Sequence, residues 1–175
     1  MDNLLAHLPI RLKTSGLKKL GIVLDADPDI GPETRWGQIK TVLQHSHYSG
    51  VPLLPGPHGT IIRGHDNPDV GVWIMPDNQT RGMLEDFVSL LVPKGDSTWN
   101  NVSQCVEEMP LERRLYRPQH ISKTKIHTWL AWQETPGTPM GLAITKRFLD
   151  ADAPNATMFL WIGMLFGAVI PEQGH

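Results

Sequence analysis

Two aspartates, Asp25 and Asp27, have the type and spacing best suited to chemistry in this sequence. They directly follow a continuous apolar run at residues 20–24. Along an extended strand, residues i and i+2 point to the same side, so these carboxylates are expected to converge where the strand ends. Like charges repel unless one is protonated or a cation lies between them, and Mg²⁺ prefers oxygen ligands. The pair therefore favours a Mg²⁺ (or Mn²⁺) site, and a solvated acidic turn before a helix is the alternative.

A second acidic group follows the apolar run at residues 70–75. Asp77 lies at the end of that predicted strand, and Glu85 and Asp86 fall in the first turn of the next predicted helix. Carboxylates in a first turn also stabilise the helix dipole, which is a purely structural alternative. Because two strands both end in acidic residues, a shared cation site is the better interpretation. Its expected ligands are Asp25, Asp27, Asp77, Glu85 and Asp86.

Basic residues further along the chain are candidates for contacts with phosphate. A lysine near a metal site can stabilise a phosphate or a leaving oxygen, and Lys123 is the candidate here, although it also suits an ordinary helix start. The cluster of Arg113, Arg114 and Arg117 fits either a phosphate-backbone patch or a solvated helix face.

The elements that must position these residues follow from the hydrophobic pattern. The run at 20–24 is apolar on both faces, which predicts a central strand of a parallel sheet. Strands and helices alternate early in the chain and helices follow, which predicts one α/β domain with a helical part from about residue 97. The expected strands are 20–24, 51–54, 60–63 and 70–75, and the expected helices are 3–13, 32–45, 82–92, 98–108, 123–133, 140–147 and 155–169.

Composition narrows the class of protein. The chain has 175 residues, 40% of them hydrophobic and 19% charged, which is typical of a globular domain. A net charge of −2 gives no global basic field that would attract nucleic acid. The single cysteine, Cys105, excludes a disulfide framework. The N-terminus lacks the pattern of a signal peptide, and the longest apolar stretch is shorter than the roughly 20 residues that span a bilayer, so we expect a cytoplasmic protein without membrane contact.

Several segments, taken in order, resemble a Toprim (topoisomerase–primase) domain. More narrowly, the chain resembles a bacterial family of stand-alone Toprim-like proteins related to the overcoming-lysogenisation-defect (OLD) nucleases. The four segments are residues 21–27, 71–78, 82–87, and 126–133 running into 136–141. The second and fourth of these resemble the family more specifically than the others.

The resemblance implies a Rossmann-like sheet of mostly parallel strands flanked by helices, with Mg²⁺-dependent chemistry on phosphodiesters. Asp25 and Asp27 match the Asp-x-Asp metal motif of the family. Glu85 matches a further acidic residue that related nucleases use for metal, Asp86 assists it, and Lys123 is the candidate for the phosphate-stabilising lysine.

One part of the Toprim pattern does not match. Toprim domains carry a Glu on a first strand, and this sequence starts at the helix that should follow it, so either the natural start lies upstream or that Glu is lacking. Two hypotheses result: a metal-dependent nuclease, or a non-catalytic metal- or nucleotide-binding subunit that would work with a separately encoded ATPase in phage defence. The expected partners are nucleic acid, that ATPase and a second copy of the chain in a homodimer.

Overall fold

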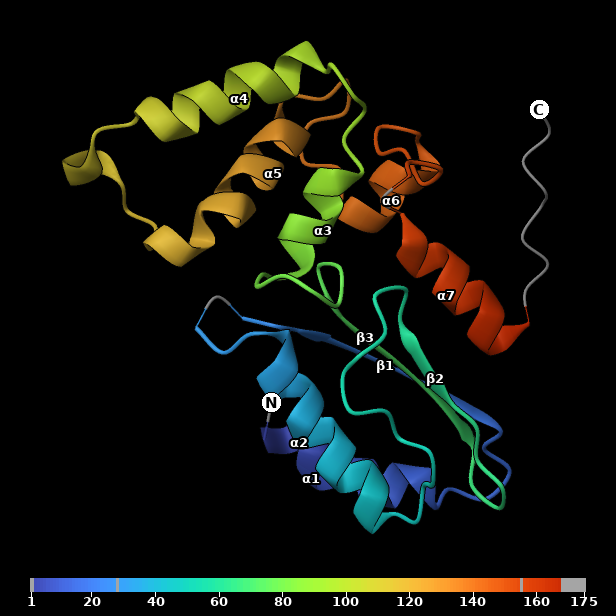
Figure 1. Ribbon diagram of the computed structural model, residues 1–175. Helices are drawn as coiled ribbons and strands as arrows, with labels where there is room; N and C mark the ends of the chain where they lie inside the picture. The colour runs from blue at the N-terminus through green and yellow to red at the C-terminus, as the bar shows by residue number, and fades with distance from the viewer. Residues whose placement is uncertain (1, 28, 155, 168–175) are drawn as a thin grey trace. The chain divides into compact units, whose positions relative to one another are not determined.

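A computed structural model describes residues 2–27, 29–154 and 156–167, which form two compact units (Figure 1). The sheet unit comprises Met1–Met83 together with Thr157–His175, and the helical unit comprises Leu84–Ala156. The chain therefore leaves the sheet unit and returns to it for the last described helix. All the described strands lie in the sheet unit, so the mixed α/β class that the sequence predicts is confirmed.

The described residues of the sheet unit form three strands in the order β1-β3-β2. Strand β1 runs parallel to β3, and β2 runs antiparallel to it, so the described sheet is mixed. The helix predicted at 32–45 is confirmed to the residue, since Pro32 begins it as a first-turn proline. The elements are α1 (Asp2–Leu12), β1 (Lys19–Asp25), α2 (Pro32–His45), β2 (Thr60–Ile62), β3 (Asp69–Met75) and α7 (Thr157–Phe166).

The predicted central position of the first strand is wrong. Among the described strands, β3 is central and almost wholly buried, whereas β1 lies at the edge of the sheet. Ile22 and Leu24 on β1 are buried, but Val23 on its other face is 41% exposed. A continuous apolar run therefore does not by itself indicate a strand that is buried on both faces of the sheet. The predicted strand at 51–54 is also wrong, because the carbonyls of Pro52 and Leu53 instead accept hydrogen bonds from the Trp36 indole, both at 3.1 Å.

Helices cover both faces of β3 (Figure 1). Val70, Val72 and Ile74 face a core formed with α1 and α2. On the opposite face, α7 brings the Trp161 ring to 5.8 Å from the Trp73 ring. A side chain at Gly71 would place its Cβ 2.5 Å from a methyl of Leu165, so only glycine allows this close approach of helix and strand.

The helical unit is built from α3 (Leu84–Leu90), α4 (Ser97–Glu108) and α5 (Ile121–Ala131), with two short 3-10 turns and α6 (Met140–Thr145). Asp96 caps α4 by accepting a hydrogen bond of 2.6 Å from the Trp99 amide. The same carboxylate accepts a bond of 3.2 Å from the Trp129 indole, which ties α4 to α5. Among the described residues, no helix combines the length and apolar character needed to cross a membrane.

Candidate functional site

The two parallel strands of the sheet unit end level with each other, as the sequence predicts. Asp25 lies opposite Met75 in the register of β1 and β3. The Ala26 amide continues the pairing by donating to the Met75 carbonyl at 3.2 Å. Asp27 and Asp77 each lie two residues beyond these strand ends. Three aspartates therefore lie at or just beyond the carboxyl edge of the sheet, which is where ligands bind in open α/β folds.

Asp27 does not continue the strand alternation that predicted its orientation. Strand β1 ends at Asp25, and Asp27 has a left-handed backbone with φ of 62°. Its amide donates to the Gly82 carbonyl at 3.0 Å, which holds the turn in place. The prediction that Asp25 and Asp27 project side by side from one strand is therefore wrong, because the chain has already turned at Asp27.

The Asp27 carboxylate forms an ion pair with Arg35 of α2. The Arg35 side chain is only 7% exposed, whereas that of Asp27 is 43% exposed. Arg35 Nη1 also donates to Gln38 at 3.2 Å, and its Nε is buried without an acceptor in the described part of the chain. A buried cation thus lies beneath a half-exposed carboxylate at the sheet edge.

The sequence-based interpretation missed Arg35, although the sequence contains a signal for it. Arg35 falls on the buried stripe of α2 together with Trp36, Ile39 and Leu43. A charged residue on an apolar stripe needs a partner, because burial of an unpaired charge is costly. Asp27 is that partner, eight residues earlier in the chain.

Asp77 stabilises its own loop. One carboxylate oxygen accepts hydrogen bonds from the Gln79 amide at 3.0 Å, the Thr80 amide at 2.7 Å and the Thr80 hydroxyl at 3.0 Å. The neighbouring Asn78 is buried, and its side-chain oxygen accepts from the Ile74 amide at 2.8 Å. The loop after β3 is therefore fixed by its own polar residues, which is a common use of Asp and Asn in turns.

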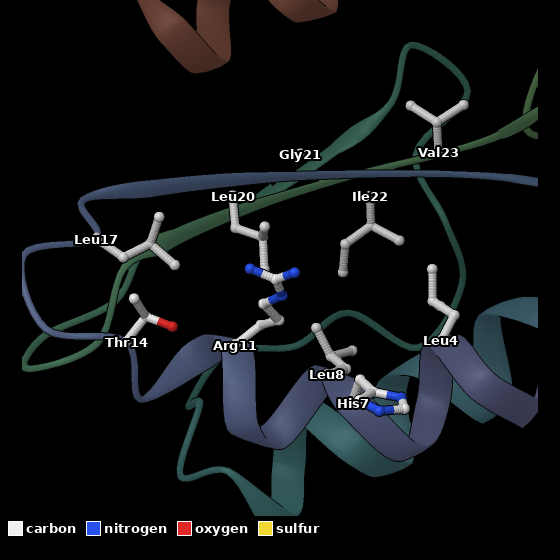
Figure 2. A pocket seen from close by; sticks show the side chains of 10 residues that line it. All are labelled: Leu4, His7, Leu8, Arg11, Thr14, Leu17, Leu20, Gly21, Ile22 and Val23. Carbon is white, nitrogen blue, oxygen red and sulfur yellow. The ribbon is translucent and has the colours of Figure 1, made fainter.

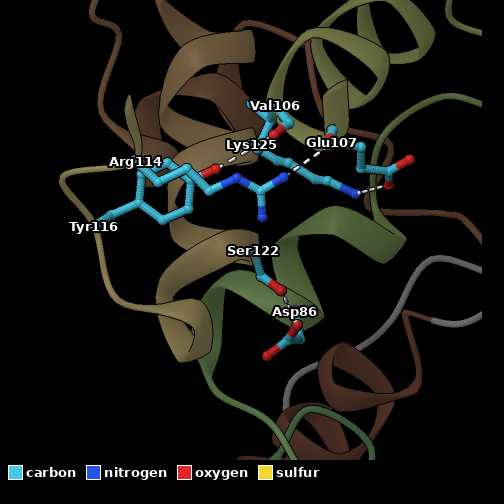
Figure 3. A network of polar contacts seen from close by, with 7 residues as sticks. All are labelled: Asp86, Val106, Glu107, Arg114, Tyr116, Ser122 and Lys125. Carbon is cyan, nitrogen blue, oxygen red and sulfur yellow. Dashed lines mark hydrogen bonds and ion pairs between the residues drawn. The ribbon is translucent and has the colours of Figure 1, made fainter. Parts of the chain in front are cut away.

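The helical unit holds the other two predicted carboxylates and the predicted lysine. Glu85, 8% exposed, forms an ion pair of 3.0 Å with Lys123, which is half-exposed. Asp86 accepts a hydrogen bond from the Ser122 hydroxyl, as Figure 3 shows. Two consecutive residues of α3 thus meet two consecutive residues of α5. Ser122 was missed because it lies 36 residues from Asp86 and forms no pattern with it in the sequence.

The predicted arginine patch includes one residue that holds a loop. Arg114 donates to the backbone carbonyl of Met109 at 2.9 Å and to that of Glu107 at 2.7 Å. Figure 3 shows the second of these bonds. Glu107 also pairs with Lys125, and the hydrogen bond from that lysine lowers the pKa of the glutamate. Arg114 follows a 3-10 turn, so of the two alternatives for the arginine cluster a helix face does not apply to this residue.

The five predicted metal ligands fall into two sets, Asp25, Asp27 and Asp77 in the sheet unit and Glu85 and Asp86 in the helical unit. Within the residues that the structure describes, no three His, Cys, Asp or Glu side chains are grouped as a complete metal site. Mg²⁺ does not require such a cage, since it commonly binds one or two carboxylates and completes its shell with water and substrate phosphate. The exposed Asp25 and half-exposed Asp27 are oxygen donors of that kind.

Comparison with known proteins gives one family. Residues 1–167 match the family described as "Protein of unknown function (DUF3226)", a match that extends over both units. No curated protein and no solved structure matches the chain.

Proposed function

The chain belongs to the DUF3226 family, and we propose that it is a Mg²⁺- or Mn²⁺-dependent nuclease, or a related phosphoryl-transfer protein, with a Toprim-like fold. The observation that carries the proposal is the level ending of two parallel strands in Asp25, Asp27 and Asp77. That edge offers oxygen donors suited to a hard divalent cation. The Rossmann-like, mostly parallel sheet of Toprim domains is part of the same proposal.

In this proposal Asp25 and Asp27 hold the cation. Bound metal activates water and neutralises charge on a scissile phosphate. Arg35 fixes the Asp27 carboxylate through their ion pair, so the ligand is oriented before the metal arrives. A phosphodiester of a nucleic acid is the expected substrate.

Glu85, Asp86 and Lys123 are proposed for the roles that the Toprim resemblance implies. Glu85 is the further acidic residue for metal, and Asp86 assists it. Lys123, which is paired with Glu85 and half-exposed, is the proposed contact to phosphate.

The test combines cleavage with direct metal binding. We expect Mn²⁺-dependent cleavage of plasmid or single-stranded substrates that EDTA abolishes, and a titration heat for Mn²⁺. Asp25→Asn together with Asp27→Asn should lower both by at least about tenfold, since both donors lose their charge. Asp29→Asn, an exposed aspartate of the same loop, is the matched control and should change neither. Equal cleavage by the double variant and the wild type would refute the proposal.

A second candidate is a non-catalytic metal- or nucleotide-binding subunit that partners a separate ATPase. It is favoured by the structural roles of the aspartates, since Asp27 is paired with Arg35 and Asp77 holds its own loop. Metal binding without cleavage, together with co-purification of a separately encoded ATPase, would support this candidate. Unaided cleavage of DNA or RNA by the purified chain would exclude it.

A further inference from the structure

The outer edge of β1 has no strand beside it in the described parts of the chain. Within residues 2–27, 29–154 and 156–167, β1 pairs with β3 alone. From Lys19 to Leu24, the backbone groups that point away from β3 therefore have no strand partner among the described residues. Protein edges of this kind are usually shielded by charge, proline or a covering segment.

An apolar groove of about 410 Å³ runs beside this edge, between β1 and α1. In Figure 2, Leu20 and Ile22 of β1 point toward α1, while Leu4 and Leu8 of α1 point toward the strand. A strand added outside β1 would send every second side chain into the same space, because side chains alternate between the two faces of a sheet. The groove thus has the place and the chemistry to receive apolar side chains of an added strand.

The charged side chains that line the groove are basic. Ten of the described residues line it and none of these is acidic: Leu4, His7, Leu8, Arg11, Thr14, Leu17, Leu20, Gly21, Ile22 and Val23. The guanidinium of Arg11 rises from α1 into the space below Leu20 (Figure 2). A carboxylate on the added strand would therefore find a cationic partner there.

We propose that this edge binds an extended segment of a partner protein, which adds a strand beside β1. The segment places apolar side chains at every second position in the groove and one acidic side chain against Arg11. Backbone hydrogen bonds to β1 supply affinity, and the groove selects the alternating pattern, as in other cases of β-strand addition. This inference is independent of the proposed metal chemistry.

A second copy of β1 fits the groove poorly. The apolar side chains that it would contribute, Ile22 and Leu24, are 4% and 9% exposed because they already pack into their own core. The apolar side chains of a separate extended peptide are not already packed into a core of their own. The observations therefore favour a peptide from another protein over self-association at this edge.

The probe is a set of fluorescent synthetic peptides of about seven residues, the length of β1. Each peptide alternates Val or Ile with Thr and carries one Glu, whose position is moved along the set. Control peptides have the same composition in an order that breaks the alternation. We expect saturable binding by fluorescence anisotropy for alternating peptides only, with slower amide hydrogen exchange along β1.

Variants locate the site. Arg11→Glu should weaken the best peptide about tenfold, and replacing the peptide Glu by Lys should restore its affinity for this variant. Leu4→Glu should also weaken binding, whereas Ile10→Glu, on the same helix but outside the groove lining, should leave it unchanged. Matching circular dichroism spectra would show that the variants are folded. Equal binding of alternating and scrambled peptides, no binding of any peptide, or a dimer abolished by Leu4→Glu would each overturn the proposal.

Discussion

Two ion pairs, Asp27–Arg35 in the sheet unit and Glu85–Lys123 in the helical unit, differ in which charge is buried. In the first pair the cation is buried and the carboxylate is not: Arg35 is 7% exposed and Asp27 is 43% exposed. In the second pair the carboxylate is buried and the cation is not: Glu85 is 8% exposed and Lys123 is 50% exposed. The cost of desolvation therefore falls on the arginine in one pair and on the glutamate in the other.

This difference has a chemical consequence. The guanidinium of arginine is always charged in proteins, so the buried Arg35 needs the Asp27 carboxylate as its counter-ion. A carboxyl group, unlike a guanidinium, also has a neutral form, which limits the cost of losing a cationic partner. The Asp27–Arg35 pair should therefore tolerate substitution less well than the Glu85–Lys123 pair, although Asp27 is the more exposed carboxylate.

The largest effect is expected from Asp27→Asn. This change keeps a side chain that accepts a left-handed backbone, but it leaves the buried Arg35 charge without its counter-ion. Breaking a buried pair costs about 3–5 kcal/mol, and the exposure of Asp27 reduces this to about 2–3 kcal/mol. The measurement is the free energy of unfolding in urea.

The control for Asp27→Asn is Asp29→Asn, which removes an exposed carboxylate from the same loop. It should change the free energy of unfolding by less than about 0.5 kcal/mol. If the two variants are equally stable, the buried arginine does not depend on Asp27, and the contrast between the Asp27–Arg35 and Glu85–Lys123 pairs fails.

A smaller effect, of about 1–2 kcal/mol, is expected from Lys123→Met in the helical unit. The methionine keeps the apolar stem but leaves the Glu85 carboxylate buried without its cation. Adding Glu85→Gln should recover part of the loss, because the double variant has no buried charge at this place. Urea unfolding of the two single variants and the double variant gives the coupling energy directly.

Lys125→Met is the matched control for Lys123→Met. Lys125 lies two residues away on the same helix and pairs with Glu107, which is exposed. Its loss should destabilise the protein less, since an exposed carboxylate stays solvated when its partner is removed. A loss at Lys125 as large as that at Lys123 would show that burial of Glu85 has no energetic weight.

The acidic residues of the sheet unit show how much could be predicted from the sequence. Asp25, Asp27 and Asp77 were placed at one sheet edge because strand periodicity and chain order are local signals, and the edge is confirmed. The direction of Asp27 was not predictable from that pattern, since the left-handed turn after Ala26 ends the alternation. The burial of Arg35 could have been predicted, because it is a charged residue on the apolar stripe of a helix.

Other features of the fold left no local signal. The contact of Ser122 with Asp86 depends on how α3 packs against α5, which no spacing in the sequence encodes. The edge position of β1 depends on which strands pair, and its apolar run is compatible with either an edge or a centre. Sequence periodicity therefore located the acidic residues, and tertiary packing decided their partners.

The smallest effect on stability is expected from Tyr48→Phe, which tests the sheet unit alone. The Tyr48 hydroxyl donates a hydrogen bond of 2.7 Å to the Pro68 carbonyl, and its loss should cost about 1 kcal/mol at neutral pH. Burial, and then the negative charge of Asp69, raise the pKa of Tyr48 to about 12. The hydrogen bond from Arg63 keeps the pKa of Asp69 low, so that charge is present throughout the alkaline range.

The raised pKa fixes the sign of the pH dependence. Folded protein keeps the Tyr48 proton while unfolded chains lose it above about pH 10, so this contribution to stability is complete below pH 10 and is lost as the pH rises toward 12. Wild-type protein should show a late component in the ultraviolet titration of its two tyrosines, and Tyr48→Phe should lack it and lose stability less steeply with pH. A late component that persists in the variant would assign it to Tyr116, in the helical unit, and remove Tyr48 as a reporter of the sheet unit.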